Sequence, residues 1–214
     1  MVQNYLSKVF LWMFIGLLVT FSTGVLVAGN ANALETIFSS GMYWLIIVAE
    51  FITVIVLSAR VNKMTPTGAK FGFILYSFLT GLTFSAVFVV YNITSIISVF
   101  LITAVLMLIF SVIGARTNLD LSKFGTYLLM ALLGIIIASI INVFVGSEAF
   151  DLGLTVISII IFLGYIAFDV QKIKEFATND PDNENLAIYG ALQLYLDFIN
   201  IFLDLLRLIG NNKD

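Results

Sequence analysis

Long apolar stretches alternate with short polar ones along the whole chain. A helix needs about 20 mostly apolar residues to cross a hydrocarbon core that is about 30 Å thick. Seven stretches reach this length, and they predict membrane-spanning helices over residues 5–29, 37–59, 71–91, 94–115, 125–146, 152–173 and 186–209. The pattern therefore predicts an all-α integral membrane protein whose seven spans form a single membrane domain over residues 1–214.

Composition agrees with this pattern. Hydrophobic residues make up 61% of the 214 residues and charged residues 11%, whereas soluble domains are about half apolar and a quarter charged. The first apolar stretch is longer than the apolar region of a signal peptide, so we expect it to remain as a span. Pro66 and Pro181 are the only prolines and both fall between predicted spans, so no span is expected to carry a proline kink.

Basic residues are concentrated on one side of the predicted membrane. Eight of the ten Lys and Arg residues lie at the start of the first span, at the ends of the second, fourth and sixth spans, or in the connections that follow these three. These residues are Lys8, Arg60, Lys63, Lys70, Arg116, Lys123, Lys172 and Lys174. Because cytoplasmic loops carry an excess of Lys and Arg, the N-terminus is predicted to be cytoplasmic and, after seven spans, the C-terminus to lie outside.

Two residue types are absent, and their absence excludes several kinds of chemistry. The chain has neither cysteine nor histidine, which rules out disulfides, thiolate or imidazole metal sites, and Ser-His or Cys nucleophiles. The net charge is only −3 and the basic residues are scattered, so no nucleic-acid partner is expected. We expect no cofactor, and any proton chemistry must involve carboxylates, lysine, tyrosine or the chain termini.

One acidic residue, Asp204, lies nearer the outer end of the last predicted span, whereas three others lie deeper inside predicted spans. They are Glu50 in the second, Asp169 in the sixth and Asp197 in the seventh. An ionised side chain near the centre of a bilayer costs at least ~2.5–3.5 kcal/mol, so such residues normally face protein or water and indicate a function. These acids are therefore the first candidates for functional residues.

The last predicted span carries a polar stripe. Gln193, Asp197, Asn200, Asp204 and Arg207 follow one another at intervals of four, three, four and three residues, which places them on one face of a helix. Asp204 and Arg207 are also spaced to form an ion pair. The sixth span has a similar stripe that ends with Asp169, so we expect the two stripes to face each other.

Two carboxyl groups brought together in such a low-dielectric place cannot both ionise easily, and the pair shares a proton. The protonated pair of Asp169 and Asp197 would form a hydrogen-bonded latch. The ionised pair would repel itself or bind a hard cation such as Ca²⁺. A nearby cation would instead hold the ionised pair closed, and Arg60, at the end of the second span, is the candidate.

Two segments resemble the Bax-inhibitor family (transmembrane Bax inhibitor motif proteins). The stretch 167–173, Ala-Phe-Asp-Val-Gln-Lys-Ile, is similar to the family's aspartate-x-glutamine segment, and the stretch 194–202, Leu-Tyr-Leu-Asp-Phe-Ile-Asn-Ile-Phe, to its seventh span. The resemblance implies a small prokaryotic plasma-membrane protein in which six helices surround a central seventh. It also implies a pH-sensitive calcium leak, with Asp169 and Asp197 as the gating pair and Arg60 as the latch arginine.

The expected function is thus a calcium leak channel in which Ca²⁺ is the transported ion. Its gating residues would be Asp169, Asp197 and Arg60, with Asp169 and Asp197 as calcium ligands. Pore-lining candidates are Glu50, Gln193, Asn200 and Asp204. The expected partners are the lipid bilayer, Ca²⁺ and protons, with other membrane proteins as further candidates.

Three alternatives remain beside the channel. A membrane-embedded regulator of a membrane protease or stress complex would act through exposed loops, and a cation/proton antiporter would also use buried aspartates. An intramembrane aspartyl protease is disfavoured, because Asp197 follows Leu-Tyr-Leu rather than Gly-x-Gly and no proline follows Pro181. We therefore expect no enzymatic activity.

Overall fold

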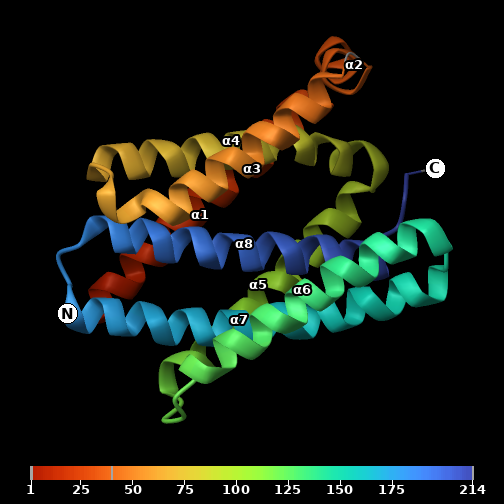
Figure 1. Cartoon of the computed structure of the whole chain (residues 1–214). Coiled ribbons are helices and arrows are strands. Elements are labelled where there is room, and N and C mark those ends of the chain that lie inside the picture. Colours follow the sequence, from red (N-terminus) through yellow and green to blue (C-terminus); the bar gives the residue numbers. More distant parts are fainter. Residues whose placement is uncertain (1, 40, 214) are drawn as a thin grey trace. The chain divides into compact units, whose positions relative to one another are not determined.

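The computed structural model describes residues 2–39 and 41–213, which form helices joined by short connections (Figure 1). The helices are α1 (Val2–Ala28), α2 (Ala31–Ser39), α3 (Met42–Arg60), the 3-10 helix η1 (Val61–Lys63), α4 (Pro66–Val90), α5 (Ile93–Arg116), α6 (Ser122–Val145), α7 (Glu148–Asn179) and α8 (Glu184–Ile209). Within the described residues, the only β-type pairing is an isolated bridge between Tyr91 and Asn212.

Seven of these helices, all except α2 and η1, are long and apolar enough to cross a membrane. The predicted number of spans is therefore confirmed. The helices are mostly longer than the apolar stretches that predict them. The extreme case is α7, whose 32 residues correspond to about 48 Å at 1.5 Å per residue and so exceed the hydrocarbon core.

The second span begins later than predicted. A separate short helix, α2, occupies residues 31–39, and α3 begins only at Met42. Gly41 ends the connection with φ 72°, a left-handed conformation that glycine adopts without steric cost. Helix α3 therefore begins five residues after the predicted start near residue 37, and Ser40 lies outside the described residues.

Helix α4 begins earlier than its apolar stretch predicts. Thr65 caps it, since its hydroxyl accepts a hydrogen bond of 3.1 Å from the Gly68 N–H. Pro66 occupies the first turn, where its missing N–H leaves no hydrogen bond unmade.

The chain divides into two compact units. Unit 1 contains α1 to α4 with residues 176–195 and 212–213, and unit 2 contains residues 94–175 and 196–211. Helices α7 and α8 each contribute to both units. The single membrane domain expected from the sequence stays a prediction.

Unit 1 is built around the pairing of α1 with α4. Glycine permits this approach, because a Cβ atom on Gly81 would lie 2.6 Å from the Thr23 Cβ and 2.9 Å from the Thr20 carbonyl oxygen. Phe73 of α4 and Tyr195 of α8 are fully buried in this unit, with ring centroids 5.7 Å apart. Small residues in α1 and α4 thus bring the helix backbones close enough for aromatic side chains to fill the remaining space.

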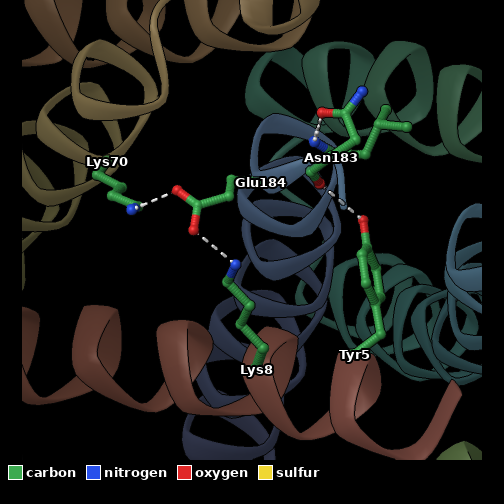
Figure 2. Close-up of polar contacts among 6 residues, drawn as sticks. Tyr5, Lys8, Lys70, Asn183 and Glu184 are labelled. Carbon is green, nitrogen blue, oxygen red and sulfur yellow. Dashed lines mark hydrogen bonds and ion pairs between the residues drawn. The ribbon is translucent and has the colours of Figure 1, made fainter. Parts of the chain in front are cut away.

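Polar contacts hold the beginning of α8 against α1 and α4 (Figure 2). The Glu184 carboxylate accepts hydrogen bonds from Lys8 at 2.9 Å and Lys70 at 2.7 Å, and the Tyr5 hydroxyl donates to the Asn183 carbonyl at 3.2 Å. Asn185 donates from its side chain to backbone carbonyls near η1. Three segments that are distant in the sequence therefore converge on the first turn of α8.

Unit 2 depends on an equally close contact between α5 and α7. A Cβ atom on Gly114 would lie 2.8 Å from the Cα and carbonyl carbon of Ala167 and would collide with its carbonyl oxygen. These contacts involve backbone atoms, so no side-chain rotation can relieve the clash. Gly114 therefore sets the distance between the two helices.

We expect Gly114→Ala to lower the stability of the protein by about 1–3 kcal/mol, since the extra methyl group must push α5 away from α7. Gly134→Ala is the matched control, because nothing lies within 4 Å of a Cβ at that helical position. Thermal unfolding of both variants in detergent, followed by tryptophan fluorescence, measures the difference. Equal midpoints for the two variants would contradict the close contact.

Candidate functional site

Two aspartates meet in unit 2. Asp169 of α7 and Asp197 of α8 are 3% and 4% exposed, and a hydrogen bond joins their carboxyl groups. Such a bond requires that one of the two groups carries a proton, because an ionised carboxylate can only accept. The sequence predicted these two residues to be neighbours, and the structure brings them together.

Apolar neighbours exclude solvent from the pair. On α7, Ile166, Val170 and Ile173 are at most 1% exposed, and on α8 Phe198 and Ile201 are at most 2% exposed. Both aspartates therefore lie in buried parts of their helices, among apolar side chains. The carboxyl groups consequently lie in a place where charge is poorly solvated.

Within the described residues, one oxygen of the pair remains without a hydrogen-bond partner, namely Oδ2 of Asp197. A buried acceptor left unpaired is costly, so its presence is unusual for a purely structural contact. The oxygen is available to a proton, a water molecule or a cation.

Helix α7 supplies two further polar groups beside the pair. Tyr165 lies one turn before Asp169 and interacts electrostatically with both aspartates. Lys172 lies nearly one turn after Asp169, interacts electrostatically with it, and has its amino group 5.8 Å from the centroid of the Phe168 ring. The positive charge that acts on Asp169 thus comes from its own helix.

A second polar contact between α7 and α8 lies further along unit 2. The Asp204 side chain is hydrogen-bonded to Ser158, while its Oδ2 is buried without a hydrogen-bond partner within the described residues. Asn200 donates from its amide to the Leu196 carbonyl of its own helix at 2.7 Å. The polar faces predicted for α7 and α8 therefore interact at two places, at Asp169 with Asp197 and at Ser158 with Asp204.

The expected ion pair between Asp204 and Arg207 is replaced by another. Arg207 forms its ion pair with Asp151 at the beginning of α7, and its effect on Asp204 is electrostatic. Spacing within one helix predicts which residues can meet, but a carboxylate on an adjacent helix can offer better geometry. Asp151 was the residue that this reasoning missed.

Glu50 lies in unit 1 and is bound by two hydroxyl groups of α4. Thr80 donates to it at 2.7 Å and Thr83 at 3.5 Å. Gln193 is half-buried, also in unit 1, and Arg60 ends α3 with an exposed side chain. The roles of these three residues in a pore or a latch stay predictions.

Sequence reasoning also missed the structural role of Gln171. Its amide donates to the Leu119 carbonyl at 2.8 Å, and its carbonyl accepts from the Leu121 N–H at 2.8 Å. The same helix anchors the end of α5 through Lys174, which donates to the Ala115 carbonyl. Gln171 therefore fixes the connection between α5 and α6 two residues from Asp169, and its place in the aspartate-x-glutamine motif was the available signal.

A metal site requires several ligands placed around one point. Within the described residues no group of three or more acidic side chains is placed to hold a metal ion. Calcium takes six to eight oxygen ligands, so an ion at the aspartate pair would need water or backbone oxygens as well. The calcium ligands expected at Asp169 and Asp197 stay a prediction.

These features define a multi-pass helical membrane protein with a buried, hydrogen-bonded pair of carboxyl groups. Residues 2–214 match the family described as "Inhibitor of apoptosis-promoting Bax1". The chain belongs to this Bax inhibitor family, as its two motifs predicted.

Bacterial members of the family cover nearly the whole chain. The "Inner membrane protein YbhL" of Escherichia coli K12 is 42% identical over 99% of this chain and 93% of its own length. An uncharacterized protein of Borreliella burgdorferi is 40% identical over 99% of this chain and 94% of its own length. An uncharacterized protein of Deinococcus radiodurans is 36% identical over 100% of this chain and 92% of its own length. The chain is therefore a YbhL-like, multi-pass protein of the inner membrane.

Gln171→Met is expected to loosen the connection between α5 and α6, because methionine has a similar size but can neither donate to Leu119 nor accept from Leu121. Hydrogen exchange measured by mass spectrometry should become faster in residues 117–121. The loss of two hydrogen bonds of about 1 kcal/mol each corresponds to exchange that is roughly tenfold faster or more.

Gln3→Met is the matched control, since Gln3 is exposed. It should leave exchange in residues 117–121 unchanged. If Gln171→Met did the same, the side chain would not be holding the connection in place.

Proposed function

We propose that the protein is a pH-sensitive calcium leak channel gated by Asp169 and Asp197. The observation that carries this proposal is the hydrogen-bonded contact between two buried carboxyl groups on neighbouring helices. Such a contact holds together only while one proton is shared. Membership in the Bax inhibitor family supports the same role.

The gate follows from the charge states of the pair. With a shared proton, the carboxyl groups form a latch between α7 and α8. Without it, two negative charges repel each other or recruit Ca²⁺, a hard cation that prefers carboxylate oxygens. Lys172 stabilises the ionised Asp169 from one side, and we assign to Arg60 the role of a cation that holds the ionised pair closed.

In this proposal α8 is the central helix and the six other spans surround it. Helix α8 has the largest buried share among the seven spans, and a helix with Gln193, Asn200 and Asp204 on one face cannot expose that face to lipid at low cost. The calcium path would follow this face and include Glu50. The unpaired Oδ2 atoms of Asp197 and Asp204 would bind water or the passing ion.

The proposed function is transport, and it involves no catalysis. The partners are the bilayer, Ca²⁺ and protons, and we place the N-terminus in the cytoplasm with the C-terminus outside. Eight basic residues at the cytoplasmic ends of the spans support this orientation.

Calcium flux into proteoliposomes tests the channel directly. The wild type is expected to pass Ca²⁺ down its gradient at a rate that changes at least about threefold between pH 6 and 8, because the gate depends on whether the pair keeps its shared proton. The double variant Asp169→Asn with Asp197→Asn cannot ionise and should lose this pH dependence. Glu35→Gln removes an exposed carboxylate of α2 and should behave as the wild type.

Two results would overturn the proposal. An unchanged pH profile in the double Asn variant would remove the pair from gating. Flux that saturates and requires an opposing proton gradient would assign a cation/proton antiporter instead. Circular dichroism and thermal unfolding of each variant establish that the comparison is made between folded proteins.

The orientation can be tested with single cysteines, since the natural chain has none. Glu148→Cys at the beginning of α7 and Asp182→Cys between α7 and α8 both lie at exposed positions. A membrane-impermeant maleimide should label Glu148→Cys in intact spheroplasts but reach Asp182→Cys only after permeabilisation. The reverse pattern would place the N-terminus outside.

A further inference from the structure

A cavity of about 260 Å³ lies between α3 and α4 in unit 1. Its wall is formed by one side of each helix. The lining residues are Tyr43, Ile47, Glu50, Phe51 and Val54 of α3, and Tyr76 and Thr83 of α4. The segment from Tyr43 to Val54 extends about 16 Å along the axis of α3, so the cavity is a narrow slot along the helix.

The slot contains a single carboxylate with half of its hydrogen-bonding capacity used. Thr80 donates to Glu50 at 2.7 Å, while the Thr83 hydroxyl lies 3.5 Å from Glu50 and 2.9 Å from the Thr80 carbonyl, to which it also donates. An ionised carboxylate has about four acceptor positions. Among residues 2–39 and 41–213, no lysine or arginine forms an ion pair with it. A carboxylate near the middle of a span is costly without a proton or a cation, so the slot favours a positively charged occupant.

The rest of the wall determines which cation fits. Calcium and magnesium require six or more oxygen ligands, and the slot offers one carboxylate among mainly aromatic and aliphatic side chains. An organic ammonium ion requires only one counter-ion, and aromatic faces attract it as well. Phe51, Tyr43 and Tyr76 supply such rings.

The exposure of these side chains indicates the route of entry. Phe51 of α3 is 63% exposed, whereas Tyr76 of α4 is only 6% exposed. The slot is therefore closed by α4 at its back and accessible along the flank of α3. This flank is the surface of a predicted span, so an occupant would arrive from the bilayer, where amphiphilic amines accumulate.

From these observations we infer that the slot between α3 and α4 binds small amphiphilic amines, with the ammonium group on Glu50 and an aromatic or aliphatic tail along Val54. The aspartate pair takes no part in this site. Glu50 is also a residue of the proposed calcium path, and the two roles are told apart because amine binding is measured without flux.

The experiment uses the full chain in phosphatidylcholine nanodiscs and 2-(4-fluorophenyl)ethylammonium as the probe, observed by fluorine NMR. The wild type should show saturable binding above the partitioning into nanodiscs without protein. Glu50→Gln keeps the shape of the side chain but removes the charge, and it should weaken binding about tenfold or more, equivalent to at least 1.4 kcal/mol. The neutral analogue 2-(4-fluorophenyl)ethanol should bind weakly and equally to both proteins.

Two further variants complete the design. Val54→Phe keeps the carboxylate but fills the slot, and it should also weaken binding at least about fivefold because the tail loses its space. Glu35→Gln removes an exposed carboxylate outside the slot and should bind like the wild type. Thermal unfolding of all variants establishes that they are folded.

Three outcomes would overturn the inference. The probe could bind no better than to nanodiscs without protein, or Glu50→Gln could bind it as tightly as the wild type. The third is that the alcohol and the amine bind the wild type equally. Loss of calcium flux in the wild type would bear on the channel proposal and would leave this test unaffected.

Discussion

Hydrocarbon cannot solvate a charge or an unmade hydrogen bond, and this constraint governs where polar groups lie in both units of the protein. Within a helix the backbone N–H and C=O groups form hydrogen bonds with each other. This requirement explains why the described residues are almost entirely helical. Polar side chains must then find partners on their own helix or on an adjacent one. The aspartate pair is the most demanding case, because two acids can share the interior only by sharing a proton.

Hydroxyl groups meet the constraint in two ways. Many return to the helix that carries them, as Thr103 does when it donates to the Val99 carbonyl at 2.8 Å. Others connect helices. Thr20 of α1 donates to the Ser77 carbonyl of α4 at 2.8 Å, and the hydroxyl of Tyr195 lies 2.5 Å from the Thr20 oxygen. Such contacts join helices without placing a net charge in the membrane.

Charged groups are held mainly at the ends of the helices, where they connect the chain instead of crossing the bilayer. Glu184 draws Lys8 and Lys70 to the beginning of α8, and Arg207 near its other end pairs with Asp151. These pairs are partly exposed, so each contributes little to stability. These ion pairs instead determine which helix ends lie next to each other. Glu50, Asp204 and the aspartate pair are the acids left away from the helix ends, and each is assigned a function above.

The sequence by itself determined the seven spans, the family and the pair of acids. Span length follows from the thickness of the bilayer, and the position of Asp169 and Asp197 on polar faces follows from the period of the helix. Both are properties of single helices, so they can be read from one segment at a time.

Tertiary structure decided which partners the polar groups take. Arg207 forms an ion pair with Asp151, and Glu50 contacts the hydroxyl groups of two threonines. Gln171 forms hydrogen bonds with the connection between α5 and α6. Tertiary structure also placed a break at Gly41 inside a stretch that the sequence predicted to be continuous with the second span. These choices depend on the distance and rotation between neighbouring helices. Close contacts such as that of Gly114 with Ala167 set these quantities, and the pattern of one helix does not contain them.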